Sequence, residues 1–322
     1  MSTSVLPSRP VSARSHSPRS GLMPLKLPAW TLPTGEMPWL PGVPMPIGPL
    51  PGRKETPALG RIGTLETRLA RTVGEVAKAQ HLRFRIFYEE MSAIADAMTL
   101  FTRRDADAFD AICDHMLVLD TAEARAGLGG KKPSIVGTYR LLRQDVADRH
   151  DGFYSAGEYD IAPLIARHEG LRFLELGRSC VMKPYRSKRT VELLWAGVWR
   201  YILDHDMDVL IGCASLEGTD PTLLAPQLSF LYHHALAPET WRVNALPERH
   251  VDMNLIPKTE LDAKAALSAL PPLLKGYLRL GAFVGNGAVI DHQFGTTDVF
   301  LILPRSAISP RYVNYYGADA GR

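Results

Sequence analysis

The sequence predicts a mixed α/β fold in which helices flank one central sheet. Two observations carry this prediction. Short apolar, strand-like runs alternate with helical patterns along the chain, and a long amphipathic segment, 187–205, lies between two of these runs. A helix between two strands of one sheet is the usual right-handed crossover. The order of the elements therefore favours one mixed sheet with helices packed against it.

The predicted strands are short apolar runs bounded by turn residues. They cover 60–69, 115–120, 134–142, 171–182, 208–215, 288–294 and 297–303. The predicted helices repeat apolar residues with the helical period, and Thr72 and Pro221 stand at two helix starts as a cap and a first-turn proline. They cover 73–90, 156–168, 187–205, 262–270, 273–281 and a segment that opens at Asp220.

Proline divides the chain into an N-terminal arm and a folded domain. Thirteen of the 25 prolines fall within the first 60 residues. Because proline removes backbone donors and fixes φ, helices and sheet ladders cannot continue through such a segment. We predict a disordered Pro-rich arm over 1–57, a folded domain over 58–305 and a C-terminal tail over 306–322. The arm is either a tolerated extension or a segment that docks on a membrane or a partner.

Charge and cysteine content exclude several classes of protein. The formal charge of +3 is concentrated in the first 60 residues, which carry +4, so the remainder carries −1. A folded domain without a basic excess is not expected to bind nucleic acid. The three cysteines are widely spaced, which argues against a disulfide framework or a thiolate zinc site and favours the reducing cytoplasm. No run reaches the ~18 apolar residues that a membrane-spanning helix needs.

The segment 173–181 carries the clearest chemical signal. It is strand-like, yet it contains Glu175 and Arg178 among apolar residues. On a regular strand these two side chains point to opposite faces, unless a bulge near Gly177 re-aims one of them. A carboxylate within an apolar strand loses hydration, so its pKa rises toward that of a general base. The alternative is a structural ion pair at a strand edge.

A basic loop follows this strand directly. Residues 183–190 bring four cationic side chains to the start of the helix 187–205. Cations, free backbone N–H groups and the positive end of the helix dipole together favour a bound phosphate. The loop lacks the glycines of a P-loop. Its alternative is a solvated basic turn.

Other polar segments carry weaker signals. The stretch 103–115 is rich in carboxylates, which could hold a cationic substrate or only solvate a loop. It lacks the spacing of a calcium-binding loop, and we expect no metal site. Cys180 lies in an apolar strand and is expected to be a core residue. His233 and His234 are adjacent on a helix, so they face different directions and do not form a ligand pair.

Seven runs of residues together resemble known enzymes. They are Leu82 to Phe87, Asp107-x-x-Asp110, Phe109 to His115, Val136 to Leu142, Glu175-x-x-Arg178, Tyr185 to Trp195 and Asp291 to Asp298. Some of them resemble the acyl-homoserine-lactone synthases, which share the fold of the Gcn5-related acyltransferases. The whole set is similar to the bacterial L-ornithine N-alpha-acyltransferases of ornithine-lipid synthesis. This similarity covers roughly residues 60–305.

The resemblance implies a Gcn5-related acyltransferase fold and a defined reaction. A 3-hydroxyacyl chain would move from acyl carrier protein to the α-amino group of L-ornithine. The product would be lyso-ornithine lipid, a precursor of phosphorus-free membrane lipids. The resemblance implies no metal and no permanently bound cofactor, since the donor substrate is 3-hydroxyacyl-phosphopantetheine on the carrier protein.

The resemblance also implies roles for individual residues. Glu175 is expected to be the general base, acting directly or through water. Arg140 and Arg178 would orient the substrate carboxylate or support Glu175. Asp110 and Asp114 are candidates for the side-chain ammonium of ornithine. The phosphopantetheine phosphate and the acidic carrier protein would meet the basic loop, through Arg186, Lys188, Arg189 and Thr190.

Two alternatives stay open at this point. A homoserine-lactone synthase that uses S-adenosylmethionine would share the fold. However, the portion beyond about residue 245 resembles the lipid enzymes, and the shorter lactone synthases do not need it. A non-catalytic module that binds acyl carrier protein or lipid would also keep the fold.

The segment 271–283 offers a possible contact with a membrane. Lys275 and Arg279 are four residues apart and share a helix face, and Leu274, Leu278 and Phe283 form an apolar side. This layout suits weak peripheral association of a cytoplasmic enzyme with the inner membrane face. The alternative is a core helix with a solvated basic edge.

Overall fold

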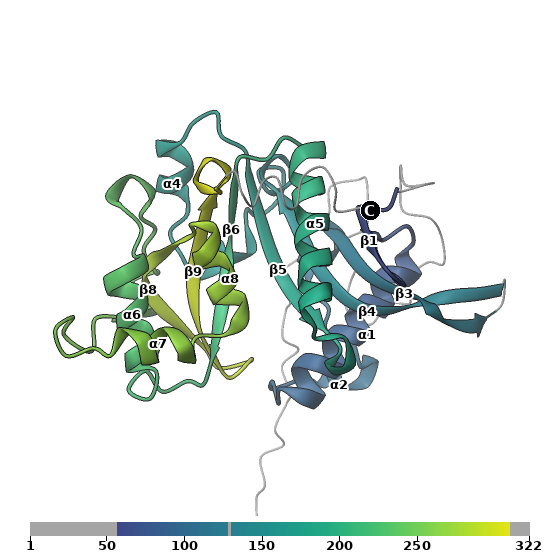
Figure 1. Cartoon of the computed structure of the whole chain (residues 1–322), viewed down its shortest axis with the longest axis horizontal. Coiled ribbons are helices and arrows are strands. Elements are labelled where there is room, and N and C mark those ends of the chain that lie inside the picture. The colour runs from purple at the N-terminus through teal and green to yellow at the C-terminus, as the bar shows by residue number, and fades with distance from the viewer. Residues whose placement is uncertain (1–56, 128–129, 310–322) are drawn as a thin grey trace, which may run out of the picture. The chain divides into compact units, whose positions relative to one another are not determined.

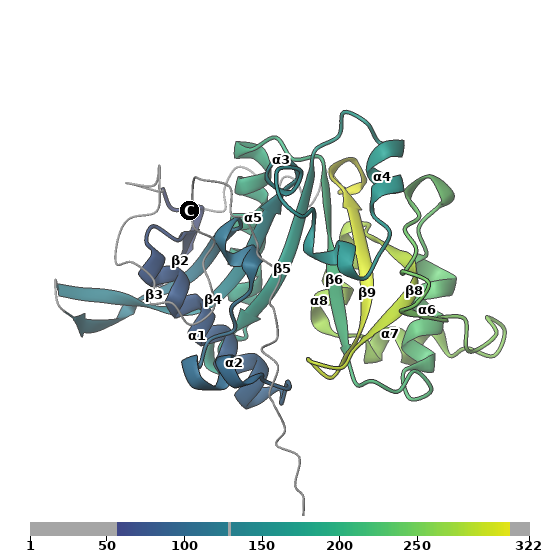
Figure 2. The same cartoon turned by 180° about the vertical axis from the view of Figure 1, so that it is seen from behind.

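The computed structural model describes residues 57–127 and 130–309 (Figures 1 and 2). Nine strands form one sheet in the order β1-β2-β3-β4-β5-β6-β9-β8-β7. All neighbours are antiparallel except β5 and β6, which are parallel. The strands are β1 (Gly60–Ile62), β2 (Leu65–Leu69), β3 (Asp114–Gly127), β4 (Gly130–Arg143), β5 (Phe173–Val181), β6 (Val209–Glu217), β7 (His250–Val251), β8 (Phe283–Asp291) and β9 (Thr296–Pro304).

Helices cover both faces of the sheet (Figures 1 and 2). One face packs against α5, α6, α7 and α8, which contribute to the largest hydrophobic core. The other face packs against α1, α3 and α4. The helices are α1 (Val73–Phe84), α2 (Ala97–Thr102), α3 (Gln144–Ala147), α4 (Ala162–Arg167), α5 (Lys188–Asp204), α6 (Ala225–Ala235), α7 (Ala263–Ala269) and α8 (Pro272–Leu280).

The structure confirms the mixed α/β fold with flanking helices. The predicted crossover is α5, which joins the parallel strands β5 and β6. Some boundaries differ from the predicted ones. A turn at Gly63, whose φ is +61°, splits the run 60–69 into two strands, and the strand predicted at 288–294 spans Phe283–Asp291. Of the predicted arm over 1–57 and the tail over 306–322, residues 1–56 and 310–322 lie outside the described residues.

Strands β5 and β6 pair over only three residues and then diverge. The parallel ladder joins Phe173–Glu175 to Val209–Ile211 and ends there, and the two strands separate beyond it (Figures 1 and 2). Gly212 stands at the point of divergence, with φ +151°. A Cβ at this position would lie 2.3 Å from the backbone carbonyl oxygen of Leu176. The close approach of the two backbones therefore requires glycine.

Helix α8 is a core helix. Leu274 is fully buried in the main hydrophobic core, and Leu278 packs against that core. The ammonium of Lys275 donates to the carbonyl oxygen of Ser268. The membrane-interface interpretation of 271–283 is therefore wrong for its apolar side, because the sheet, and not lipid, covers Leu274. Over the described residues, no helix combines the length and the apolar character needed to cross a bilayer.

We predict that Gly212→Ala destabilises the fold. The added Cβ meets a backbone carbonyl, which cannot rotate away as a flexible side chain would. Overpacking of this kind lowers the free energy of unfolding by about 1–3 kcal/mol, measurable by urea denaturation. Gly276→Ala is the matched control, since nothing lies within 4 Å of its added Cβ on α8. That variant should keep or slightly raise stability, and equal stability of the two variants would contradict the prediction.

Candidate active site

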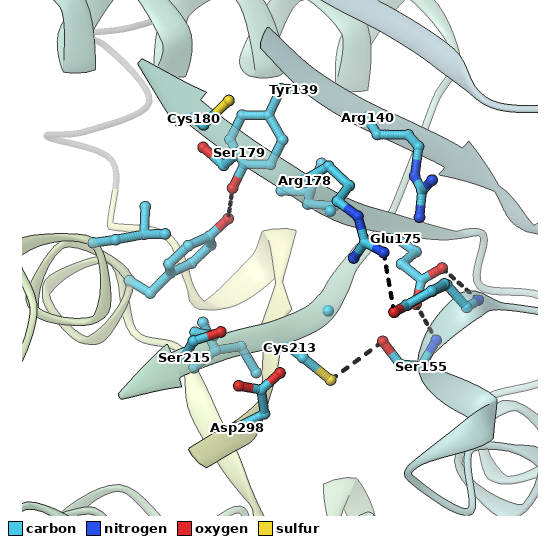
Figure 3. A pocket seen from close by; sticks show the side chains of 18 of the residues that line it. Tyr139, Arg140, Ser155, Glu175, Arg178, Ser179, Cys180, Cys213, Ser215 and Asp298 are labelled. Atoms are coloured by element: carbon cyan, nitrogen blue, oxygen red, sulfur yellow. Dashed lines mark hydrogen bonds between the residues drawn. The ribbon is translucent and has the colours of Figure 1, made fainter. Parts of the chain in front are cut away.

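Beyond their three paired residues, β5 and β6 leave a gap between them. A bulge in β5 at the start of this gap changes the direction of its side chains. Arg140 pairs with Gly177, whereas Thr138 pairs with Cys180, so two residues of β5 oppose one residue of β4. Arg178 occupies the bulge with φ +51°. The bulge brings Glu175 and Arg178 to the same cavity (Figure 3), as the sequence had required for the two to act together.

The gap opens into a cavity of about 450 Å³. This volume is typical of a small-molecule site. Residues from both faces of the sheet line it, because it passes between β5 and β6. On the α5 face the lining is apolar and includes Leu194, Trp195, Val198, Leu210 and Leu301. On the opposite face the lining carries charged and polar side chains, including Arg140, Glu175, Arg178, Cys213, Ser215 and Asp298, beside apolar rings such as Phe87 and Phe294 (Figure 3).

Glu175 is buried and held by two backbone donors. The N–H groups of Tyr154 and Ser155, in the short helix η3 (Tyr154–Gly157), donate to its two carboxylate oxygens at 2.8 Å each. Burial raises the pKa of Glu175, and the hydrogen bonds from η3 oppose that rise. A carboxylate has about four acceptor positions, so each oxygen can still accept from a water or an amine. Glu175 makes no ion pair with Arg178 in the structure, where Arg178 pairs instead with Asp105 and Asp107.

Three arginines and three aspartates form a buried ionic cluster beside the cavity. The members are Arg83, Arg140, Arg178, Asp105, Asp107 and Asp110. Arg83 is completely buried and pairs with Asp105 and Asp110 at 2.7 Å. The formal charges of the cluster cancel, which is what makes such burial tolerable. The guanidiniums of the cluster hold the pKa of Asp110 well below its usual range, against the opposing effect of burial.

The structure brings three of the five predicted catalytic and substrate-binding residues to the cavity, namely Arg140, Glu175 and Arg178. Asp110 lies behind the wall, with its oxygens engaged by Gln80, Arg83 and Arg140. Asp114 accepts a hydrogen bond from the hydroxyl of Tyr201 on α5. Neither aspartate lines the cavity, so their assignment to the ornithine ammonium stays a prediction that the geometry does not support.

The basic loop lies at the edge of the cavity. Arg186 lines the cavity and pairs with Glu90, while Lys188 is exposed and pairs with Glu192 on the same helix. Arg189 is exposed as well. Thr190 is buried in the first turn of α5, where the hydroxyl of Ser187 caps its N–H. Cations and a helix start therefore do meet at the cavity, but the side chain of Thr190 does not face solvent.

A second carboxylate group was missed by sequence reasoning. Oxygens of Glu158, Asp291 and Asp298 lie within 4.8 Å of one another, a spacing that suits a cation. Asp291 and Asp298 line the cavity, and Asp298 pairs across the ladder with Ser215. The signal that could have found Asp298 is a carboxylate at the head of the apolar strand 299–303.

Burial perturbs this carboxylate group. Burial raises the pKa of Glu158 to about 7, and repulsion from the Asp298 carboxylate adds to this rise. A hydrogen bond from Cys213 and the positive charge of Arg249 act in the opposite direction. Burial also raises the pKa of Asp298. Crowded carboxylates with raised pKa values are typical of functional sites, because an incoming cation relieves both the burial and the repulsion.

Comparison with known proteins identifies the family. The acetyltransferase (GNAT) domain model matches residues 82–196. An L-ornithine N(alpha)-acyltransferase of Agrobacterium fabrum is 55% identical over 263 residues, which cover 82% of this chain and 88% of that protein. The chain belongs to the L-ornithine N(alpha)-acyltransferase family. This N-acyltransferase has further relatives of the same name in Brucella abortus (54% identical, 82% of this chain and 92% of that protein) and Rhodobacter capsulatus (41%, 78% and 94%).

Solved structures with similar folds are distant in sequence. The acyl-homoserine-lactone synthase LasI is 13% identical with a TM-score of 0.41, over 80% of this chain and 97% of that one. FeeM, an N-acyl amino acid synthase from uncultured soil microbes, is 12% identical with a TM-score of 0.38, over 74% and 90%. The family comparison confirms the resemblance found in the sequence.

We predict that Glu158→Gln changes how the stability of this N-acyltransferase depends on pH. The pKa of Glu158 is about 7 in the fold and near 4.5 when unfolded, so the folded state binds more protons between these values. The free energy of unfolding of the native enzyme therefore falls as pH rises from 4.5 to 7. Gln removes this penalty, and the variant should exceed the native enzyme by up to about 3 kcal/mol at pH 8.

Thermal and urea unfolding at pH 5 and pH 8 would test the prediction. The advantage of the variant should shrink toward pH 5, where Glu158 is protonated in the fold. Asp151→Asn, at an exposed turn, is the control and should leave the pH dependence unchanged. A variant that is less stable than the native enzyme at pH 8 would show that Glu158 is charged and stabilising there.

Proposed function

We propose that the enzyme transfers a 3-hydroxyacyl chain from acyl carrier protein to the α-amino group of L-ornithine, giving lyso-ornithine lipid. One observation carries this proposal: a single cavity joins an apolar lining on one face of the sheet to a polar lining on the other. An acyl chain needs the first environment and an amino acid needs the second. The names of the relatives, which are 54–55% identical, support ornithine as the acceptor.

Glu175 is proposed as the general base. The α-amino group of ornithine attacks the thioester carbonyl carbon, and the C–N bond forms as Glu175 takes the amine proton directly or through a water. The tetrahedral intermediate then expels the phosphopantetheine thiolate, which takes up the proton that Glu175 had accepted, and Glu175 returns to its ionised form. A buried carboxylate with a raised pKa suits this role.

The edge of β5 that faces the gap is proposed to stabilise the intermediate. Beyond Glu175 the structure records no ladder between β5 and β6 in the described residues. Backbone N–H groups on that edge are therefore available to the developing oxyanion, where preorganised donors have their largest effect on rate. Arg178, stacked over the rings of Tyr154 and Phe294 at 4.7 and 4.9 Å, would orient the ornithine carboxylate, with Arg140 supporting it.

Asp298 and Asp291 are proposed to receive the side-chain ammonium of ornithine. Apart from Glu175, they are the acidic residues that line the cavity in the described part of the chain. Asp298 is more than nine-tenths buried, so a cationic group beside it is weakly screened. Such a contact would favour a diamino acid over a neutral one.

The basic loop is proposed to receive the donor. Arg186 at the cavity edge, with exposed Lys188 and Arg189, would meet the phosphopantetheine phosphate and the acidic carrier protein. The start of α5 adds its backbone N–H groups, and Thr190 supports that turn.

No metal or permanent cofactor is needed for this chemistry, so chelators should leave turnover intact. A loss of turnover in EDTA that added metal restores would assign the carboxylate group to a metal ion instead.

The decisive assay combines purified enzyme, L-ornithine and 3-hydroxyacyl carrier protein. Mass spectrometry should detect N-acylornithine, whose acyl group lies on the α-nitrogen. A robust lactone product from S-adenosylmethionine would favour a homoserine-lactone synthase. Carrier binding without turnover on any amine would favour a non-catalytic module.

We predict that Glu175→Gln lowers kcat/KM by about 10²–10⁴-fold. Gln keeps the shape but cannot take a proton. Its side-chain NH₂ group replaces one of the two oxygens and would face the N–H of Tyr154 or Ser155, which costs that hydrogen bond. The thermal midpoint must therefore be measured beside the rate, with exposed Glu217→Gln as the control. A general base also gives an acidic limb to the pH–rate profile, which the variant should lose. Near-native turnover in a folded variant would exclude this role.

We predict that Asp298→Asn weakens selection of ornithine. Norvaline has the same carbon chain without the side-chain amine, so the ratio of kcat/KM for ornithine to that for norvaline isolates the contact. Losing a charged hydrogen bond of about 1.5–3 kcal/mol should lower this ratio by about 10- to 150-fold. Asp151→Asn serves again as the control. An unchanged ratio would place the ammonium elsewhere, with Asp110 and Asp114 as the next residues to test.

A further inference from the structure

An exposed apolar surface lies on the segment 91–101. Five of the eleven large apolar side chains that are strongly exposed among the described residues fall within these eleven positions. They are Met91 (50% exposed), Ile94 (68%), Met98 (42%), Leu100 (60%) and Phe101 (86%), and we call them the apolar patch. Such clusters on a protein surface mark contact with a partner or a membrane.

The apolar patch adjoins the rim of the cavity. Met91 belongs to the patch and also lines the cavity. The N–H of Ile94 donates to the carbonyl of Gln293, next to Phe294 in the cavity wall. Helix α2, which carries Leu100 and Phe101, stands at the end of the molecule where β5 and β6 are apart (Figures 1 and 2). The patch therefore extends the apolar surface from the cavity to the outside.

Cationic side chains stand beside the apolar patch. The loop 183–189 carries four cations and no acidic residue. Lys183 and Arg186 reach Glu90, the neighbour of Met91, at 3.7 and 2.5 Å. Lys183 and Arg103 are exposed cations beside the patch, and the proposed function does not assign them to the carrier protein. Apolar side chains beside such cations match an anionic lipid surface, in which headgroups meet the cations and acyl chains meet the apolar groups.

We propose that the apolar patch docks on an anionic bilayer, with Leu100 and Phe101 among the acyl chains. The open end of the cavity then faces the lipid. This inference rests on the proposed function in one respect: an acylated amino acid that leaves through this opening would otherwise expose its chain to water, at a free-energy cost that grows with chain length.

A lipid surface fits better than the carrier protein as the occupant. An acidic carrier protein would be held by the cations of the loop, and such a contact does not require Phe101 to be apolar. Contact with the acyl chains of a bilayer does require an apolar side chain at such an exposed position. The carrier protein is nevertheless an outcome that the experiment separates from lipid.

Vesicle flotation tests the proposal on the full-length protein. The probes are vesicles of phosphatidylcholine with and without phosphatidylglycerol, at low and high salt. The native chain should float with the anionic vesicles at low salt and dissociate in part at high salt, since screening weakens the attraction of the cations. The double variant Leu100→Ser/Phe101→Ser should partition at least tenfold less. The matched control is Leu223→Ser, at a position 77% exposed outside the patch, and it should float like the native chain.

Two further readouts keep the outcomes distinct. Turnover without vesicles should be the same in the double variant as in the native chain, because neither residue lines the cavity. Native-like flotation of the double variant would overturn the proposal, as would a native chain that does not float. Weaker carrier-protein binding with unchanged flotation would assign the patch to the carrier protein. Failure of the acyltransfer assay would leave the flotation result intact, so the two proposals fail separately.

Discussion

The early end of the ladder between β5 and β6 is the constraint on which the rest of the site depends. Three paired residues hold the two parallel strands together, and the backbones then approach once more at Gly212 before they separate. The separation opens a passage through a sheet that would otherwise be a closed barrier between its two faces. Because strand residues alternate between faces, the same strands supply an apolar lining toward α5 and a polar lining toward η3. The proposed reaction needs both environments to meet at one point.

The buried ionic cluster gives this opening a rigid polar wall. Charges in a low-dielectric environment are tolerated only when paired, and Arg83, Arg140 and Arg178 each find aspartate partners. Those aspartates are therefore paired. Apart from Glu175, the carboxylates that line the cavity in the described part of the chain are Asp291 and Asp298, which we propose for the cationic side chain of the substrate. In the same way, Glu175 has a double role, since its oxygens hold the start of η3 while facing the cavity. A group with two such roles requires both stability and rate to be measured when it is changed.

Local sequence patterns predicted the parts of the site that depend on neighbours along the chain. The crossover helix 187–205 follows from the pattern of its own segment. The bulge near Gly177 was named only as the condition under which Glu175 and Arg178 could share a face, and the structure fulfils that condition. Asp291 and Asp298 lie close together in the β8–β9 hairpin, but Glu158 joins them from the end of η3. Local patterns could not predict this group, because only the tertiary fold brings η3 to that hairpin. The apolar side of 271–283 failed for a related reason: amphipathic spacing does not say whether lipid or a sheet covers the apolar face.

A crystal structure with bound N-(3-hydroxyacyl)-L-ornithine would show whether one cavity holds both ends of the product. We expect one ligand threaded between β5 and β6, with its acyl chain against Leu194, Trp195 and Val198 on the α5 face. The amide would lie beside Glu175, and the side-chain ammonium beside Asp298. An acyl chain on the polar face, or a ligand that does not pass between the two strands, would show that the gap between β5 and β6 does not join the two substrate sites.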